Sequence, residues 1–305
     1  MLRLALKTAV ASYGHTKPLK DQTVTSDRIK LEHEEVVPIT RAFRSMVRTQ
    51  NFDVSEMALS TYLCALAHGK PITALPVFVL RRFEHAAITY NTKSGIESPA
   101  DLVGRRVGVR SYTYTPGVWV RGILQSVYGV DSNQVTWVLT GDEHVAEYEA
   151  PGNVVNATEG SELAAMLLSG EIDAAIGAGD LDSPDIQPLI PDPRNAAIDY
   201  FRQTGIYPIS HALVVKDQLL ADNPWLGQEL FSVFDAAKNQ YLTRLASGAS
   251  EGPQDEAMAQ MQQIVGNDPL LYGLEPNRKS LESFIQSNVD QKIIPKSLKV
   301  DDIFA

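Results

Sequence analysis

The feature that most constrains the fold is an alternation of short apolar segments with helix-start and helix-stop signals. Ser98-Pro99-Ala100-Asp101 combines an N-cap serine, a proline at the first helical position and an acid at the third, and Gly104 ends this turn before the strand 105–110. Thr115-Pro116 then opens a helix that closes at Gly129. Such an alternation predicts an α/β fold.

Further strand and helix signals lie on both sides of this unit. The expected strands are Leu2 with Leu4 and Leu6, 28–37, 72–80, 85–91, 134–139, 172–176 and 206–215, and the expected helices begin at Pro38, at about Glu56 and at Glu162, with an almost wholly helical region from 223 to 291. Two α/β units followed by helices indicate a bilobal protein. Composition alone leaves open whether the lobes are consecutive or interleaved.

Charge and cysteine content narrow the classes of partner and compartment. The chain of 305 residues has 27 Lys and Arg against 37 Asp and Glu, a formal charge of -10, and lacks a basic run interleaved with aromatics, so we do not expect a nucleic-acid partner. Its one cysteine, Cys64, lies in an apolar helical stretch. Lys7 interrupts the N-terminal apolar segment, and no apolar run could span a membrane, so we expect a cytoplasmic protein without a membrane partner.

Several stretches carry a resemblance to a known family. The segments 52–62, 96–109 (IESPADLVGRRVGV) and 168–175 (LSGEIDAA) look like the type 2 periplasmic-binding-protein fold. Within that fold, the chain resembles the 4,5-dihydroxyphthalate decarboxylase family over nearly its full length, most clearly in 81–85 (RRFEH), 117–124 (GVWVRGIL), 141–145 (GDEHV), 205–211 (GIYPISH) and 223–225 (NPW).

The resemblance implies an α/β, two-lobed fold with a ligand cleft between the lobes and a helical C-terminal region. Residues 1–90 and 207–305 would form lobe 1, and residues 91–206 the inserted lobe 2, with crossing strands near 88–92 and 204–209. It also implies a cytoplasmic carboxy-lyase that converts a hydroxylated aromatic dicarboxylate, 4,5-dihydroxyphthalate above all, into protocatechuate and CO2. No organic cofactor is chemically obligatory for such a substrate, and a homo-oligomer is compatible with this assignment.

Ligands of open α/β sheets bind beyond the carboxyl ends of the strands, and that rule selects the candidate substrate-binding loops. Arg110 and the hydroxyl-bearing loop that follows it precede a predicted helix N-terminus, where amide groups and the helix dipole favour a carboxylate; alternatively Thr115 only caps the helix while the tyrosines pack. The candidate substrate-binding residues are Tyr13, Gly14, Ser55, Arg81, Arg82, Arg110, Ser111, Tyr112, Thr113, Thr115 and Tyr207.

Loss of CO2 from an electron-rich ring requires protonation of the ring carbon that carries the carboxylate, so the site needs an acid. His15 and His211 lie on predicted loops of the same lobe, and either could supply this proton. Glu56 and Asp180 are the candidate bases for a ring hydroxyl. Each also has a structural alternative: helix-start capping for Glu56, and a solvated turn for Asp180.

Two other interpretations stay open. Glu143, His144 and Glu147 have a metal-like pattern, but their spacing is generic and a divalent ion would need further ligands, so we predict no metal site. The same fold could also serve as a non-catalytic solute-binding protein for an anionic aromatic ligand. The absence of a recognisable signal sequence and the two candidate histidines favour the lyase.

Overall fold

The computed structural model describes residues 3–305, so Leu2 of the expected first strand lies outside the described residues. The described residues divide into two compact units, unit 1 with residues 3–81, 209–279 and 298–305, and unit 2 with residues 82–208 and 280–297. These sets differ from the expected lobes at three places. Residues 82–90, 207–208 and 280–297 group with the middle of the chain, the last because the helix at 278–290 packs there.

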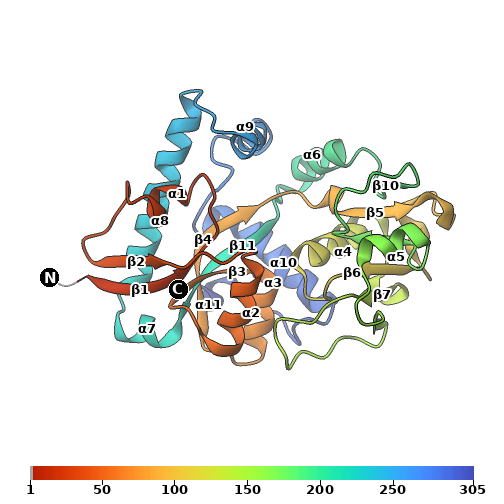
Figure 1. Ribbon diagram of the computed structural model, residues 1–305, viewed down its shortest axis with the longest axis horizontal. Helices are drawn as coiled ribbons and strands as arrows, with labels where there is room; N and C mark the ends of the chain where they lie inside the picture. Colours follow the sequence, from red (N-terminus) through yellow and green to blue (C-terminus); the bar gives the residue numbers. More distant parts are fainter. Residues whose placement is uncertain (1–2) are drawn as a thin grey trace. The chain divides into compact units, whose positions relative to one another are not determined.

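Unit 1 is built on a five-stranded sheet of order β2-β1-β3-β11-β4 (Figure 1). Strand β1 is parallel to β2 and β3, whereas β11 is antiparallel to β3 and β4. The strands are β1 (Leu4–Ala9), β2 (Ile29–His33), β3 (Val54–Ala58), β4 (Ile72–Arg81) and β11 (Ile209–Lys216). Every residue of β3 is buried, because β3 lies between β1 and β11 in the sheet and helices α2 and α3 contact it.

The helices of unit 1 come from both ends of the chain. They are α1 (Lys17–Lys20), α2 (Thr40–Thr49), α3 (Leu59–Ala67), α7 (Asp217–Asp222), α8 (Leu226–Ala246), α9 (Pro253–Val265) and α11 (Val300–Ile303), with a 3₁₀ turn η5 (Glu275–Asn277). Helix α2 buries Phe43 and Met46 in the core, because residues three positions apart lie on the same face of a helix. None of the helices within residues 3–305 is both long and apolar enough to cross a membrane.

Unit 2 contains a six-stranded sheet of order β10-β5-β9-β6-β7-β8. Strand β6 is parallel to β7 and β9, so the carboxyl ends of these three strands share one edge of the sheet. Strand β5 is antiparallel to β9, which brings the residues just before β5 to that same edge. The strands are β5 (Ile88–Asn91), β6 (Arg106–Val109), β7 (Thr136–Leu139), β8 (Val154–Asn156), β9 (Ala174–Ile176) and β10 (Ile186–Pro188).

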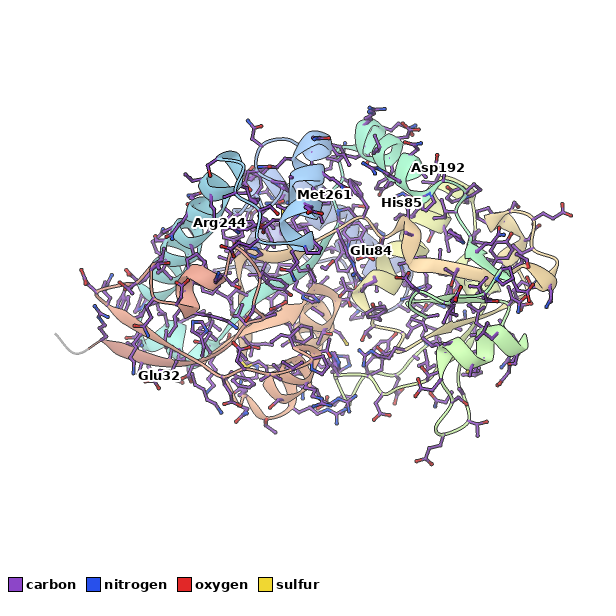
Figure 2. The ribbon with its side chains drawn as sticks, turned by 45° about the horizontal axis from the view of Figure 1, so that its top comes forward. Glu32, Glu84, His85, Asp192, Arg244 and Met261 are labelled. Atoms are coloured by element: carbon purple, nitrogen blue, oxygen red, sulfur yellow. The ribbon has the colours of Figure 1, made fainter. Side chains whose placement is uncertain are left out.

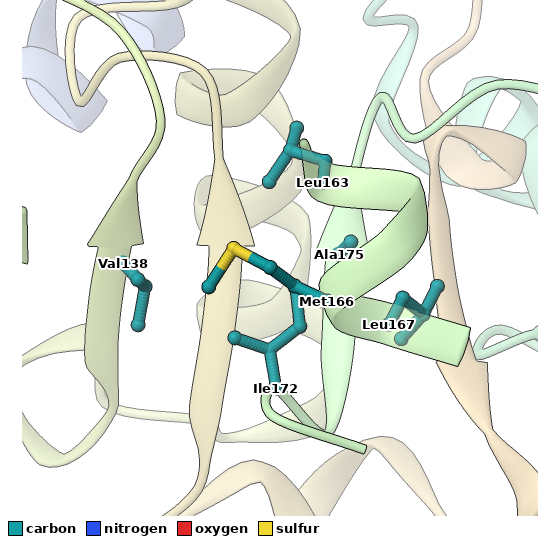
Figure 3. Packing of buried hydrophobic residues seen from close by; sticks show 6 residues of the cluster. All are labelled: Val138, Leu163, Met166, Leu167, Ile172 and Ala175. Atoms are coloured by element: carbon teal, nitrogen blue, oxygen red, sulfur yellow. The ribbon is translucent and has the colours of Figure 1, made fainter. Parts of the chain in front are cut away.

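Apolar helix faces cover the sheet of unit 2. In Figure 3, Leu163, Met166 and Leu167 of α5 pack against Val138, Ala175 and Ile172, and together they form one buried cluster. The helices are α4 (Thr115–Tyr128), α5 (Leu163–Ser169), α6 (Pro193–Thr204) and α10 (Arg278–Asp290, whose first two residues belong to unit 1), with 3₁₀ turns η1 (His85–Ala87), η2 (Thr92–Ser94), η3 (Pro99–Leu102) and η4 (Ser132–Gln134).

One predicted boundary is wrong in a way that matters for the site. The helix expected from about Glu56 begins only at Leu59, and Glu56 lies in strand β3 instead. The reason is tertiary, because pairing with β1 and β11 continues the strand and three donors from other segments satisfy the carboxylate. Glu56 is therefore not a helix-capping residue.

Candidate functional site

In unit 1, three residues meet at the buried carboxylate of Glu56. The hydroxyl of Tyr13 donates to Oε1 at 2.6 Å, and the Nδ1 atom of His211 lies 2.6 Å from the same oxygen. The amide of Ala11 donates to Oε2 at 2.9 Å. Strand β3 supplies Glu56, strand β11 supplies His211, and the loop after β1 supplies Tyr13 and Ala11, so neighbouring strands of one sheet build this cluster.

The surroundings of Glu56 favour its ionised form. Its residue is 0% exposed, and burial alone would raise the pKa of the carboxyl group. The hydrogen bond and charge of His211, with the hydrogen bonds from Tyr13 and Ala11, outweigh burial and hold the pKa below its usual value. Glu56 is thus a buried anion that is hydrogen-bonded to His211, Tyr13 and Ala11.

His211 remains partly accessible. Its side chain is 12% exposed, and the ring of Phe43 contacts it edge-on with ring centres 4.9 Å apart. Because Glu56 engages Nδ1, the tautomer is fixed and Nε2 is the nitrogen left to exchange a proton with a ligand. This arrangement can perform general acid–base chemistry.

His15, the other candidate acid, is placed differently. It is 4% exposed and stacks on Tyr13 with ring centres 5.2 Å apart and planes within 4°, while Tyr241 of α8 covers it from another side. Burial lowers its pKa to about 4, although the nearby charge of Glu56 opposes that shift. His15 is therefore neutral near pH 7 and poorly suited to donate a proton.

Two other predicted residues of unit 1 have packing roles. A Cβ atom on Gly14 would lie 2.2 Å from Cε2 of Tyr241, so only glycine fits between the loop and α8. The hydroxyl of Ser55 is fully buried and donates to the carbonyl oxygen of its neighbour Glu56 at 2.8 Å. Neither residue offers a free polar group to a ligand.

In unit 2, predicted residues gather at the edge where β6, β7 and β9 end. Arg110 follows β6, and its Nη2 atom lies 3.3 Å from Nε2 of His144, which follows β7. A guanidinium has only donors, so this imidazole nitrogen accepts. The guanidinium carbon of Arg110 also lies 5.9 Å from the ring centre of Tyr114.

The hydroxyl-bearing loop before α4 already holds an anion, the carboxylate of Glu143. The amides of Tyr112 and Thr113 donate to it at 2.5 Å and 3.2 Å, and the hydroxyl of Thr113 donates as well. These donors are those expected to bind a substrate carboxylate. Their engagement by Glu143 corrects that expectation and leaves Arg110 as the cationic group of this loop.

Arg82 lies at the same edge, just before β5. Its Nε donates to Oε1 of the buried Glu84 at 2.9 Å, and it also hydrogen-bonds Tyr114, whose ring packs against Gly177 after β9. Burial alone would lower the pKa of Arg82, but the charge of Glu84 and these bonds raise it above the ordinary value. Figure 2 shows Glu84 next to His85 at the start of η1.

The remaining candidates are dispersed. Arg81 belongs to unit 1, where it donates to Oδ1 of Asn277 at 2.7 Å. Tyr207 packs on Phe83 in unit 2, with ring centres 4.8 Å apart. Asp180 of unit 2 is exposed on the turn after β9, Glu147 is exposed, and Ser111 and Thr115 are buried. Between residues 3 and 305, no three His, Cys, Asp or Glu side chains are grouped as they would be around a metal ion.

Sequence reasoning missed three residues that shape these clusters: Phe43 on His211, Tyr241 on His15, and Arg121 behind Tyr112. In the sequence, Phe43 and Tyr241 are typical of the apolar faces of helices, and only tertiary packing brings each of them to a histidine. Arg121 carried a usable signal, because a charged residue inside the apolar segment 117–124 requires polar partners when that segment is buried.

Sequence comparisons place the chain among enzymes of one kind. Residues 41–155 match the family described as NMT1/THI5 like. The 4,5-dihydroxyphthalate decarboxylase of Comamonas testosteroni is 31% identical over 321 residues, which cover 100% of this chain and 97% of the relative. The 4,5-dihydroxyphthalate decarboxylase of Pseudomonas putida is 37% identical over 219 residues, which cover 66% of this chain and 83% of the relative.

Solved structures give the fold. The periplasmic aliphatic sulphonate binding protein SsuA of Escherichia coli superimposes with a TM-score of 0.56 at 12% identity, covering 99% of this chain and 98% of SsuA. The desulfurization enzyme DSZB superimposes with a TM-score of 0.54 at 16% identity, covering 99% and 96%. The fold is that of the type 2 periplasmic binding proteins, as expected from the sequence, and it occurs in both a binding protein and an enzyme.

Proposed function

The chain belongs to the 4,5-dihydroxyphthalate decarboxylase family, and we propose that it removes one carboxylate as CO2 from a hydroxylated aromatic dicarboxylate of the 4,5-dihydroxyphthalate type. The structural observation that carries this proposal is the Glu56–His211 pair, a partly accessible imidazole held on a buried carboxylate. Such a pair is the acid–base device that protonation of a ring carbon requires.

In the proposed reaction, Nε2 of His211 donates its proton to the ring carbon that bears the departing carboxylate. The hydroxyl para to that carbon donates electron density and stabilises the resulting cation. The bond to the carboxylate then breaks, its electron pair restores the aromatic ring, and CO2 leaves. His211 ends neutral and takes its next proton from solvent.

Glu56 acts through His211 in this scheme. Both of its carboxylate oxygens accept hydrogen bonds from protein groups, and the residue is 0% exposed, so it is not placed to take a proton from a ring hydroxyl. It fixes the His211 tautomer and stabilises the imidazolium form. We therefore assign Glu56 as a positioning residue.

We assign carboxylate recognition to Arg110 of unit 2. Arg110 follows β6 at the edge where the parallel strands of unit 2 end, and its guanidinium donates to Nε2 of His144. A charge-assisted hydrogen bond to a carboxylate contributes about 1.5–3 kcal/mol. Arg110→Ala should thus weaken the binding of phthalate by about ten- to a hundred-fold, as measured by calorimetry; unchanged affinity would remove Arg110 from the site.

The activity test is incubation of the purified protein with a panel of hydroxylated phthalates and benzoates, following CO2 release and ring absorbance. His211→Gln should lower kcat by about 10²–10⁴-fold while phthalate still binds. His15→Gln is the matched control and should keep most of the turnover, because His15 is neutral and enclosed. Ligand binding without CO2 release from any substrate of the panel would favour the non-catalytic solute-binding alternative.

The cytoplasmic location expected from the sequence stays a prediction, which fractionation of the native host cells would test. A homo-oligomer is likewise a prediction, and light scattering of the purified protein would test it.

A further inference from the structure

In unit 2, charged side chains hold the peptide group between Tyr112 and Thr113 at both ends. Arg121 donates from Nη2 to the carbonyl oxygen of Tyr112 at 2.6 Å. On the other side of the same peptide, the amide of Thr113 donates to Oε2 of Glu143 at 3.2 Å. A cation and an anion thus fix the orientation of one peptide, and we call this arrangement the peptide clamp.

Arg121 is an unusual residue to bury for packing alone. It is 1% exposed, and its two hydrogen-bond acceptors are neutral oxygens, those of Tyr112 and of the Gln291 side chain at 2.6 Å. Its Nη1 atom is buried without a hydrogen-bond partner. Burying a guanidinium without a directly bonded carboxylate is costly, so a purely structural position would be filled better by an apolar side chain.

Aromatic rings and a second segment keep Arg121 in place. Its guanidinium carbon lies 4.1 Å from the ring centre of Tyr112 and 5.0 Å from that of Trp137. Gln291, which accepts from Arg121, also donates to the carbonyl oxygen of Val118 in α4 at 2.9 Å. Arg121 itself belongs to α4, which begins at Thr115, two residues after Thr113, so the cation is fixed relative to the start of that helix.

The clamp ties the loop after β6, which carries Arg110, to the loop after β7, which carries Glu143. Arg110 ends the segment just before Tyr112, and Glu143 belongs to the loop after β7. Gly141 in that second loop lies against the first one, since a Cβ atom there would be 3.2 Å from the carbonyl oxygen of Arg110. The direction of the Arg110 side chain thus depends on a backbone that Glu143 and Arg121 hold from opposite sides.

We propose that Arg121 and Glu143 are positioning residues for carboxylate recognition, which act through the Tyr112–Thr113 peptide to aim the guanidinium of Arg110. This inference rests on the proposed function, because it takes Arg110 as the group that binds the carboxylate. Glu143 itself contributes as an internal anion that accepts hydrogen bonds from the amides of Tyr112 and Thr113.

The first test needs no ligand. Hydrogen exchange of the 110–115 segment should be at least about tenfold faster in Glu143→Gln and in Arg121→Met than in the wild-type protein. Glu149→Gln, which removes the same charge from an exposed position of the same loop, is the control and should leave the exchange unchanged. Equal exchange rates of the 110–115 segment in the wild-type protein and the three variants would overturn the proposal that the peptide clamp fixes this segment.

The second test separates positioning from general stabilisation. Glu143→Gln should weaken phthalate binding about tenfold, and the double variant Arg110→Ala/Glu143→Gln should bind no more weakly than Arg110→Ala alone. Additive losses would overturn the inference, because they would mean that Glu143 acts independently of Arg110. Tighter binding in Glu143→Gln would overturn it as well, and would make Glu143 a competitor of the ligand.

Failure of the proposed function has a different signature. A protein that binds phthalate with these couplings but releases no CO2 from 4,5-dihydroxyphthalate contradicts the decarboxylase assignment and leaves the positioning role standing. A wild-type protein that binds no phthalate overturns the role of the clamp in carboxylate recognition, whatever the exchange rates are.

Discussion

His15 and His211 belong to the same unit, yet their rings meet different surroundings. His15 is enclosed by Tyr13 and Tyr241, and its Nε2 atom has no hydrogen-bond partner, so the neutral ring is favoured. His211 meets a carboxylate that burial has separated from water. At the residue scale, burial without a charged partner keeps His15 neutral, whereas His211 is hydrogen-bonded to a carboxylate.

The first prediction concerns Glu56→Gln. The amide has no negative charge and cannot stabilise the imidazolium form, so kcat should fall by about 10²–10⁴-fold while calorimetry shows unchanged phthalate binding. Glu32→Gln, on an exposed position of β2, removes the same charge and should leave both measurements at the wild-type value. Wild-type turnover in Glu56→Gln would contradict the assigned role.

The second prediction is a pH dependence of stability due to His15. Its pKa is about 4 when folded and near 6.5 in a model peptide, so between these values the unfolded chain binds a proton that the folded one does not. The free energy of unfolding should therefore decrease as the pH falls through this window, by about 2 kcal/mol between pH 7 and pH 5.

His15→Gln should reduce this decrease, as measured by urea unfolding at each pH. His85, whose pKa burial also lowers to about 4, contributes with the same sign in both proteins. Protonation of Glu56 affects the free energy of unfolding only below about pH 4.5, the ordinary pKa of a glutamate, because folding lowers the pKa of Glu56. The same pH dependence in wild type and variant would refute the account of His15.

At the scale of elements, close contact between the loop after β1 and helix α8 sets the position of Tyr13. Gly14 allows this contact, since its backbone faces the ring of Tyr241, and the hydroxyl of Tyr241 is held by Asp255 of α9 at 2.9 Å. The Tyr241 ring therefore cannot move aside without losing this hydrogen bond. The loop, α8 and α9 are therefore coupled.

The third prediction follows from this contact. Gly14→Ala places a Cβ atom 2.2 Å from a ring carbon of Tyr241, and the free energy of unfolding should fall by about 1–3 kcal/mol or more. Because Tyr13 moves with the loop, kcat should fall as well. Gly152→Ala is the control, since nothing lies within 4 Å of its Cβ position. If Gly14→Ala lowered the free energy of unfolding no more than Gly152→Ala, the loop would be able to move away from Tyr241, which would contradict the prediction.

At the scale of the whole molecule, segments far apart in sequence complete each unit. Residues 280–297 supply unit 2 with Phe284, which stacks on Trp119 of α4 with ring centres 4.7 Å apart, and with Gln291 of the peptide clamp. Unit 2 is thus built from residues more than a hundred positions apart. A fragment limited to residues 82–208 should not fold cooperatively.

The fourth prediction tests this assembly. Phe284 is fully buried, so Phe284→Ala should lower the free energy of unfolding by about 3–5 kcal/mol and change the fluorescence of Trp119. Glu282→Ala, on the exposed side of the same helix, should change neither. A small effect of Phe284→Ala would mean that the segment 280–297 contributes little to unit 2.

Local signals determined much of the secondary structure before any tertiary contact was known. Helix α4 begins at Thr115 and ends before Gly129, as predicted, and α5 begins at Leu163, one residue after the expected start. The capping box of Ser98 and Asp101 is present as well. These features depend on hydrogen bonds and dihedral angles within a few residues, which the sequence specifies directly. The family resemblance supplied the fold class.

Tertiary structure decided what the candidate residues do. The partners of Glu56 come from Ala11, Tyr13 and His211, which are 45, 43 and 155 residues away, and they convert an expected helix start into a buried strand position. Glu143 reaches Tyr112 across 31 residues and takes the donors expected to bind substrate. Burial and hydrogen bonding between distant segments depend on the assembled sheets, because no local pattern records which side chain will satisfy a buried charge.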